Sequence, residues 1–422
     1  MESGGAGPIK KRIFCFSFFL ISVLTHITTS YANTGSVYGL GTIAPAMGNA
    51  YTAHPDDPSA LYYNPAGLAL EKKDQLLIGL TYFSPLIWVK GTFGAKNYID
   101  NDRVIGLTVG LATNLGHMTG YRQLSRISTG FFLFTPPDRA YTVHAIPTST
   151  LSFPLYKDTA SQLMLLFGLG YRVSRYLQLG ASILLVMPGQ MTTSYYINPS
   201  STSQSLNPIV LINRSLIISA APEFGFIVKP LKKFAFGAVY RQKNSSGLHG
   251  STGFIINGQP YISEIDYEKV FTTPDQIAGG VSITPVNNLR INADVTYSVW
   301  SDKSVTDTQG NSFTANDTIS ASVGVEYKPT QEWAVRGGYT YSPSPFPPQT
   351  GTTNYMDSDK SIYSIGGGYN FGWFKTDIKS CINVFIQMQQ LKERNNNSQL
   401  LSLGYSDGGD VWSSGISISF RL

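Results

Sequence analysis

Segments in which apolar and polar residues alternate are the feature that most constrains how this chain can fold. The clearest is segment 290–300, RINADVTYSVW, where every second residue from Ile291 to Val299 is apolar. Because successive side chains of a strand point to opposite faces, such a segment forms a strand with one apolar and one polar face. The same alternation recurs in residues 320–328, 333–341 and 416–422. The pattern therefore predicts an all-β fold.

Composition and hydropathy indicate that these strands cross a membrane. Charged residues make up only 14% of the chain, well below the roughly one quarter typical of soluble proteins, and aromatic residues reach 13%. No segment after residue 32 approaches about 18 consecutive apolar residues, which excludes a bundle of membrane-spanning helices. Strands of about ten residues with one lipid-facing and one lumen-facing side are typical of a transmembrane antiparallel β-barrel. The alternative, a soluble β-sandwich or propeller, would need a charged outer surface.

Further candidate strands bring the predicted barrel to about 14 strands, with about 12 to 16 allowed by the pattern. They lie at 75–84, 104–115, 126–135, 142–155, 162–172, 176–187, 209–228, 233–243, 252–272, 276–284, 361–371 and 379–391. Short connections such as 284–288 and 328–331 alternate with long ones such as 244–258 and 342–359, and we expect the short ones in the periplasm. Aromatic residues near strand ends are expected to form interfacial girdles. They are Tyr195, Tyr196, Trp300, Trp333, Trp373 and Trp412.

The N-terminus has the three parts of a secretory signal peptide. Lys10, Lys11 and Arg12 precede an apolar run at 13–24, and Ser30 and Ala32 provide small residues at the expected cleavage site. We predict that residues 1–32 are a signal peptide cleaved after Ala32. A retained membrane anchor is the alternative, but the apolar run is shorter than the roughly 20 residues that a spanning helix needs.

Charge and cysteine content argue against several classes of function. Cleavage removes three basic residues and one acidic residue, so the net charge falls from +5 to +3. This balance is too mild, and its basic residues are too scattered, for a nucleic-acid partner. Cys15 leaves with the signal peptide, and the single remaining Cys381 supports neither a disulfide framework nor a thiolate metal cluster.

The mature chain has no motif that indicates an enzyme, and we expect none of its functions to need a cofactor or a metal. Its histidines, His54, His117, His144 and His249, show no metal-ligand spacing. No G-x-S-x-G nucleophile motif is present. An outer-membrane hydrolase that assembles its site from separate strands, using one of the last three histidines, is an alternative.

The stretch 35–70 is rich in small residues, almost uncharged, and lies between the signal peptide and the first strand. Its GLGTIA segment (39–44) superficially resembles a dinucleotide-binding fingerprint, but no strand precedes it, so we expect its small residues to allow close packing inside a lumen. Asp56 and Asp57 are expected to form a turn rather than a cation site.

The tetrapeptide Asn64, Pro65, Ala66 and Gly67 predicts a compact chain reversal. Asn before Pro favours an extended conformation, Pro removes a donor, and Gly permits a positive φ. We divide the chain into a signal peptide (1–32), an N-terminal hatch that plugs the lumen (33–73) and a transmembrane β-barrel (74–422).

Three runs in this stretch, GNAYTA (48–53), DDPSA (56–60) and YNPAGLA (63–69), resemble the hatch of the FadL-type outer-membrane transporters of long-chain fatty acids and hydrocarbons. TPDQI (273–277), YSVWSD (297–302) and residues 333–341, 357–359 and 366–371 are similar to the same family. The C-terminus departs from the usual terminal aromatic residue, because Phe420 precedes a final Leu422.

The resemblance implies a 14-stranded barrel in a Gram-negative outer membrane that transports long-chain fatty acids or other hydrophobic molecules passively. Ligands would be captured at the outer face and released sideways into the membrane, with Asn64, Pro65, Ala66 and Gly67 as gate and Phe346 and Pro347 as ligand contacts. It also implies a monomer whose partners are membrane lipid and the barrel assembly machinery. Because burying one methylene stabilises by about 0.8 kcal/mol, we expect a lumen lined by apolar and small residues. An adhesin or surface antigen acting through loop 342–359 is the alternative.

Overall fold

The structure is a computed structural model. It describes residues 34–70, 74–91, 94–98, 103–136, 162–187, 191–196, 209–216, 219–256, 259–302, 304–306, 312–351, 355–372, 379–398 and 404–421. The predicted signal peptide, the strand expected at 142–155, His144, Trp373 and Leu422 lie outside these residues.

Fourteen antiparallel strands close into a barrel, as the alternation predicts. They are β1 (Gln75–Gly91), β3 (Val104–Asn114), β4 (Ile127–Thr135), β5 (Leu163–Arg172), β6 (Leu177–Met187), β9 (Ser219–Leu231), β10 (Phe234–Arg241), β13 (Asp275–Val286), β14 (Leu289–Val299), β17 (Thr318–Tyr327), β18 (Trp333–Ser342), β20 (Lys360–Gly372), β21 (Lys379–Ser398) and β22 (Tyr405–Arg421). The first and last close the barrel, pairing from Gln75 with Arg421 to Gly91 with Tyr405.

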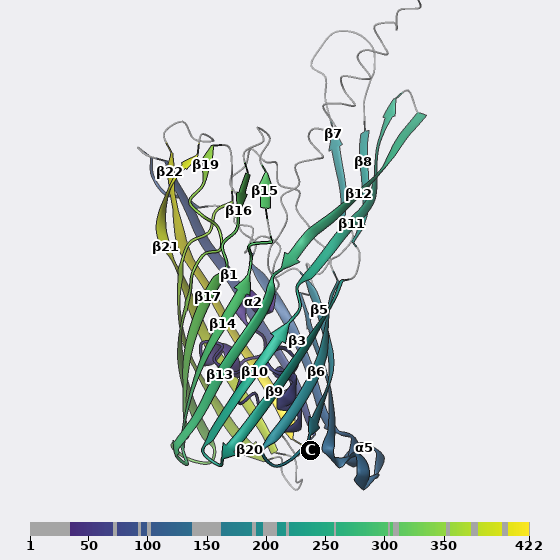
Figure 1. Cartoon of the computed structure of the whole chain (residues 1–422). Helices are drawn as coiled ribbons and strands as arrows, with labels where there is room; N and C mark the ends of the chain where they lie inside the picture. Colours follow the sequence, from purple (N-terminus) through teal and green to yellow (C-terminus); the bar gives the residue numbers. More distant parts are fainter. Residues whose placement is uncertain are drawn as a thin grey trace, which may run out of the picture.

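Four more strands extend the wall beyond the barrel. They are β7 (Met191–Tyr196), β8 (Ile209–Leu216), β11 (Asn244–Ile256) and β12 (Gln259–Thr273), and they form a separate sheet at the end far from the C-terminus (Figure 1). Segment 244–258, predicted to be a loop, is therefore mostly strand. Its sequence lacks clear alternation, and its strand conformation comes from backbone pairing with β8 and β12. Shorter strands are β2 (Asn97–Tyr98), β15 (Ser304–Thr306), β16 (Ser312–Thr314) and β19 (Thr350–Gly351).

The alternating faces point as predicted, apolar outward and polar inward. On β14, Val295 is 52% exposed, whereas its neighbours Asn292 and Asp294 are buried. On β17, Ile319 is exposed and Glu326 is buried. No helix in the described part of the chain is long and apolar enough to cross a membrane.

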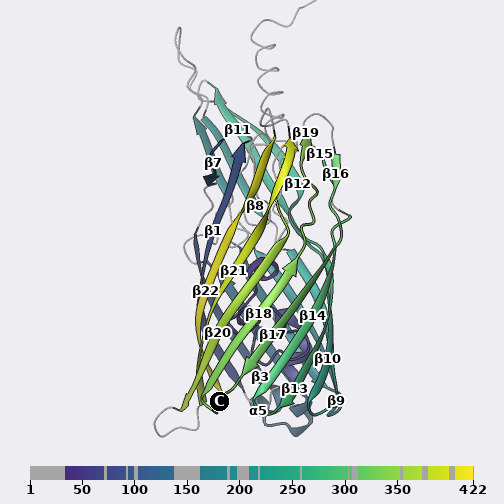
Figure 2. The same ribbon diagram turned by 90° about the vertical axis from the view of Figure 1, so that its left-hand side faces the viewer.

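The two ends of the barrel differ in their connections. Adjacent strands are joined by short turns such as Lys232–Lys233 and Asn287–Asn288 at the end where the C-terminus lies (Figure 2), which is therefore the periplasmic end. Of the predicted girdle residues, Trp333 and Trp412 face outward, but Trp300 is buried inside the outer end and is not interfacial. Its neighbours come from other loops, which no local pattern could reveal. The side chains of Tyr195 and Tyr196 lie outside the described part.

Residues 34–70 lie inside the barrel as short helical turns (Figures 1 and 2). These are α2 (Thr34–Tyr38), α3 (Ile43–Ala46), α4 (Ala60–Tyr63) and the 3₁₀ helix η1 (Pro65–Ala69). We call residues 34–70 the hatch. Most of its side chains are buried, and it contacts the inner face of strands on both sides of the barrel.

Candidate functional site

The hatch forms many backbone hydrogen bonds of its own, but its helices of four or five residues leave terminal polar groups that the barrel wall satisfies. Arg241 of β10 donates from Nε to the carbonyl oxygen of Tyr62 (2.8 Å) and from Nη2 to that of Tyr63 (3.0 Å), at the end of α4. Arg172 of β5 donates from Nη2 to the carbonyl oxygen of Ala69 (2.7 Å) at the end of η1. Wall side chains thus complete the hatch's helix ends.

Asn64 connects the hatch directly to the wall. Its Oδ1 accepts from the Ala66 amide (3.1 Å), and its Nδ2 donates to the carbonyl oxygens of Thr52 (3.0 Å), Phe226 (3.0 Å) and Ala238 (3.3 Å). The extended backbone that we expected before proline is present, with φ −168° and ψ 107°. The side chain therefore joins the hatch to both β9 and β10.

Gly67 is needed for space and not for a positive φ, which corrects our expectation. Its φ is not among the positive values, and a Cβ there would lie 2.5 Å from Pro55 Cγ and 2.6 Å from the Pro55 carbonyl oxygen. The left-handed conformations occur earlier in the hatch, at Gly39, Gly41, Gly48 and Asn49. The residue types at 64–67 predict the chain reversal but not the close approach of Pro55 to Gly67.

Glycines on the inner face of the wall let the hatch backbone touch the strands. A Cβ at Gly180 would lie 2.1 Å from the Ala66 amide nitrogen, and one at Gly225 would lie 2.1 Å from Asn64 Oδ1. We call these wall positions the glycine belt. It comprises Gly168, Gly170, Gly180, Gly225, Gly237, Gly324, Gly338 and Gly366. The hatch is therefore fitted to this wall with no room for larger side chains.

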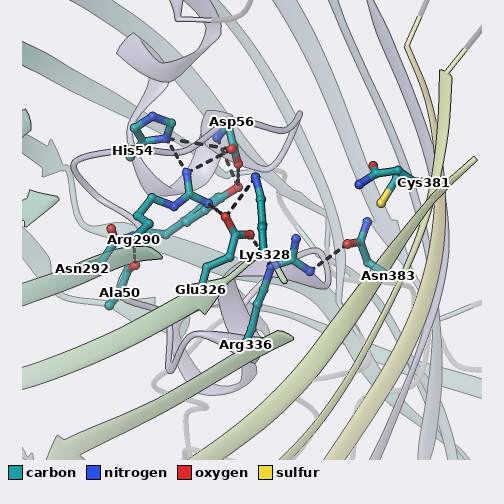
Figure 3. Close-up of polar contacts among 12 residues, drawn as sticks. Ala50, His54, Asp56, Arg290, Asn292, Glu326, Lys328, Arg336, Cys381 and Asn383 are labelled. Carbon is teal, nitrogen blue, oxygen red and sulfur yellow. Dashed lines mark hydrogen bonds and ion pairs between the residues drawn. The ribbon is translucent and has the colours of Figure 1, made fainter. Parts of the chain in front are cut away.

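An ionic network lies between the hatch and strands β14, β17 and β18 (Figure 3). Arg290 Nη1 lies 3.1 Å from Asp56 Oδ2, and Arg290 Nη2 lies 3.1 Å from Glu326 Oε1. Arg336 Nε lies 2.7 Å from the other oxygen of Glu326. The Tyr51 hydroxyl also donates to Asp56. The partly exposed Asp56 and the buried Glu326 thus alternate with buried guanidinium groups, which stabilise their charges.

The hatch residues of this region have altered pKa values. Burial and the Arg290 charge lower the pKa of His54 to about 3, so the neutral ring accepts a hydrogen bond from Arg290 Nη1 (2.7 Å). Burial opposes ionisation of Asp56, but the Arg290 charge holds its pKa well below the usual value. Burial raises the pKa of Asp57 to about 6, although its Oδ1 accepts from the Ser59 amide (2.9 Å). That last bond is the turn we predicted at Asp57.

The lumen beyond the hatch is polar on one side. A cavity of about 160 Å³ lies between the hatch residues Tyr62 and Tyr63 and the inner faces of β14, β17 and β18. We call it the polar chamber. Its wall hydroxyl groups are those of Thr296, Ser298, Thr318, Ser320, Ser322, Thr340 and Ser342.

The opposite side of the lumen is apolar. The inner faces of β3, β4, β5, β6 and β9 carry buried hydrophobic side chains that form one cluster with hatch residues such as Tyr38 and Leu40. We call this the apolar face. It consists of Val104, Phe132, Phe134, Met164, Leu166, Leu184, Val186 and Ala221. The expectation of a lumen lined by apolar and small residues therefore fits this half, whereas the polar chamber combines small hydroxyl residues with charged ones.

Phe346 and Pro347, predicted to contact ligand, both line one open cavity but differ in burial. Phe346 is buried in a cluster with Trp300, Phe313 and Tyr355, with ring centroids 5.9 to 6.3 Å from its own. Pro347 is half-buried, and the cavity that both residues line has a volume of about 460 Å³. Sequence reasoning missed the partners of Phe346 because they come from separate outer segments and show no shared pattern.

In the described part of the chain, no group of three or more His, Cys, Asp or Glu side chains is placed to hold a metal ion. His54 lies in the ionic network. His117 lies apart from it at the periplasmic end, where its Nδ1 is 3.7 Å from Asp74 Oδ1.

Comparison with known proteins identifies relatives over almost the whole chain. The family model described as "Outer membrane protein transport protein (OMPP1/FadL/TodX)" matches residues 19–421. Alkane uptake protein A of Marinobacter nauticus is 22% identical over 397 residues, which cover 87% of this chain and 86% of that protein.

Solved structures have the same fold. A FadL homologue from Pseudomonas aeruginosa superposes with a TM-score of 0.59 at 16% identity, covering 94% of this chain and 99% of its own. The toluene transporter TodX from P. putida gives a TM-score of 0.59 at 18% identity, covering 92% and 99%. At these identities the structural likeness establishes the fold alone.

Proposed function

Because this chain belongs to the outer membrane protein transport family (OMPP1/FadL/TodX), whose members transport hydrophobic compounds, we propose that its own substrates are uncharged hydrocarbons such as alkanes. The observation that carries the proposal is the apolar face, which continues across five inner strands. Burying an alkyl chain against such a surface stabilises by about 0.8 kcal/mol per methylene. A hydrocarbon could therefore move along it without entering water.

The cations of the polar chamber favour an uncharged ligand over an ionised fatty acid. Arg241 already binds two hatch carbonyl oxygens and lies 4.0 Å from Glu223. Lys360 Nζ lies 3.4 Å from Asp357 Oδ1. A fatty-acid carboxylate would compete with these partners for the two cations, whereas a hydrocarbon makes no such demand. The similarity to an alkane uptake protein also supports the hydrocarbon.

We further propose that the hatch seals the barrel and that the ligand displaces part of it. Tyr38 packs against Phe83 of β1 with ring centroids 4.2 Å apart, in the same cluster as the apolar face. A hydrocarbon that replaced this ring would exchange one apolar contact for another. Asn64, Pro65, Ala66 and Gly67 would form the closed part of the gate, since their wall contacts must break before this segment can move.

The barrel wall is lower at β3 than at β1, and this difference in height supports release of the ligand sideways into the membrane. Beyond the pair Phe83–Val104, β1 continues to Gly91 alongside β22 but no longer pairs with β3. The apolar face reaches the outer ends of β3 to β6 at Val104, Phe134, Met164 and Val186. We propose that a monomer, inserted by the barrel assembly machinery, releases its ligand into lipid over these strand ends.

Uptake of labelled compounds tests the substrate class. We expect cells that express the protein to take up labelled hexadecane faster than cells that lack it, with a smaller difference for labelled oleate at a pH where it is ionised. Equal hexadecane uptake in both strains contradicts transport. Faster uptake of oleate than of hexadecane contradicts the proposed substrate class and leaves transport intact.

A further inference from the structure

The connection between β3 and β4 is a folded insert at the periplasmic end. It contains α5 (Leu115–Thr119) and the 3₁₀ helix η2 (Arg122–Arg126), whereas the connections 232–233 and 287–288 at this end are two-residue turns. Asn114 fixes both ends of the insert, because its Oδ1 accepts from the Gly116 amide (3.0 Å) and its Nδ2 donates to the Ser125 carbonyl oxygen (3.0 Å). The insert is thus a folded element held by hydrogen bonds and not an irregular loop.

The exposed residues of this insert include both apolar and basic side chains. Met118 is 64% exposed and Tyr121 is 68% exposed, and Arg122 and Arg126 are exposed beside them. Large apolar side chains exposed next to cations are unfavourable in water but suit a membrane interface, where an apolar stem meets lipid chains and a charged group meets phosphate. The insert therefore has the chemistry of an interfacial element.

The insert also lies at the correct height for lipid headgroups. It stands at the foot of the barrel (Figure 1), next to strands whose lipid-facing side chains include Leu111 and Tyr171. Ile127, the first residue after η2, pairs directly with Tyr171. The guanidinium of Arg175 lies 4.5 Å from the ring centroid of Tyr176 on the next turn. Aromatic residues at the end of a membrane strand mark the interface.

The described part of the periplasmic rim is basic overall. Its exposed acidic residue is Glu332. Its exposed basic residues are Arg122, Arg126, Arg175, Lys232, Lys233, Lys328 and Lys379. An excess of basic side chains beside a bilayer attracts anionic lipids.

We propose that the 115–126 insert binds anionic phospholipid headgroups of the periplasmic leaflet. Arg122 and Arg126 bind the phosphate group, and Met118 and Tyr121 enter the boundary between headgroups and acyl chains. A membrane is favoured over an acidic periplasmic protein because the insert adjoins lipid-facing strand residues at the interface. This binding fixes the depth of the barrel on the side where the apolar face lies.

Depth-dependent quenching in nanodiscs tests the location. A fluorophore on M118C, in a Cys381→Ser background, should be quenched by headgroup-labelled nitroxide phospholipid. The matched label at Thr330→Cys, on the exposed turn before β18, should be quenched less. An unquenched label at position 118 overturns the proposal, because it places the insert outside the headgroup region. The same result is expected if the insert's partner is a soluble acidic protein instead of the membrane.

Lipid retention tests the chemistry. In nanodiscs that mix phosphatidylglycerol with phosphatidylcholine, native mass spectrometry should show enrichment of phosphatidylglycerol on the full-length mature protein. In the variant R122Q/R126Q, the enrichment of phosphatidylglycerol over phosphatidylcholine should fall about fivefold for each arginine removed. The control R103Q/K392Q removes two exposed charges at the opposite rim and should retain it. Equal enrichment in both variants, or loss of enrichment on adding inorganic phosphate, overturns the proposal.

Discussion

Arg290 joins the hatch to the wall, and its removal should cost more than that of any exposed charge nearby. Arg290→Met leaves the largely buried Asp56 carboxylate, whose side chain is 15% exposed, without its main partner. We expect the free energy of unfolding in detergent to fall by about 3–5 kcal/mol. Lys328 is the matched control, since its Nζ lies 3.2 Å from Glu326 but the side chain is half-exposed.

Lys328→Met should therefore cost less than about 1 kcal/mol. Urea unfolding followed by circular dichroism measures both values. Equal losses in the two variants would show that the network does not hold the hatch.

Asn64 should keep the barrel impermeable to ions. Asn64→Ala removes the bonds to Phe226 and Ala238 and leaves the Ala66 amide without its acceptor, a loss of about 1–3 kcal/mol. We expect a higher ion conductance in planar bilayers. Asn370→Ala, which removes similar bonds at an exposed periplasmic turn, should conduct like the wild type. If Asn64→Ala conducts ions no better than the wild type, Asn64 does not seal the barrel.

Asp57 should make the hatch less stable as pH rises. Its pKa is about 6 in the fold against 3.8 without burial, so between these values the unfolded chain has lost a proton that the folded chain retains. Stability then falls as pH rises from about 4 to 6, by on the order of 2 kcal/mol.

Asp57→Asn cannot lose this proton, so it should match the wild type near pH 4 and be more stable than the wild type above pH 6. His54 acts in the opposite direction in both proteins, because its lowered pKa costs stability as pH falls below about 6.5. Unfolding midpoints measured across this range compare the two. A constant difference between them at every pH would reject the Asp57 assignment.

At the scale of residues, sequence predicts what depends on near neighbours. The reversal at Asn64 and the turn at Asp57 follow from adjacent residue types. The partners of Asp56 do not, because Arg290 is 234 positions away and only the closed barrel brings them together. The need for glycine at position 67 is likewise tertiary, because it depends on the approach of Pro55.

The glycine belt determines how the hatch element fits its wall. Gly225→Ala would place a Cβ 2.1 Å from Asn64 Oδ1 and should destabilise the protein by about 1–3 kcal/mol, with increased proteolysis of the hatch. Gly279→Ala on β13, which is separated from β9 by β10, meets no atom within 4 Å and is the control. Limited proteolysis of both variants measures the effect, and equal resistance would mean that the hatch is loosely seated.

At the scale of elements, the strands that separate lipid from lumen are predictable because each must alternate. β11 and β12 extend beyond the barrel, where a strand does not separate lipid from lumen and need not alternate. The segment that forms β11 was therefore expected to be a loop. The α5–η2 insert was also missed, because its two short helical turns are too brief for a periodic signal. The strands expected at 209–228 and 252–272 include β8 and β12 of the outer sheet, but β7, most of β11 and the insert were not predicted.

The whole molecule is divided lengthwise, with an apolar face on β3 to β9 and a polar chamber on β14 to β18. Sequence did not reveal this division, since lumen-facing residues of distant strands combine only after closure. The division gives a physical reason for a hydrocarbon substrate. An apolar molecule would be stabilised by burial against the apolar face, whereas the opposite side presents the wall hydroxyl groups.

Hexadecane uptake by proteoliposomes with altered lumen residues tests this central claim most directly. Phe134→Asn places an amide on the apolar face and should slow uptake by about tenfold, because hydrocarbon cannot hydrogen-bond to it. Ser320→Ala in the polar chamber should leave uptake unchanged. Heat-dependent gel mobility confirms that both variants are folded. The account predicts a loss confined to Phe134→Asn, and it is contradicted if folded Phe134→Asn transports as the wild type does while Ser320→Ala fails.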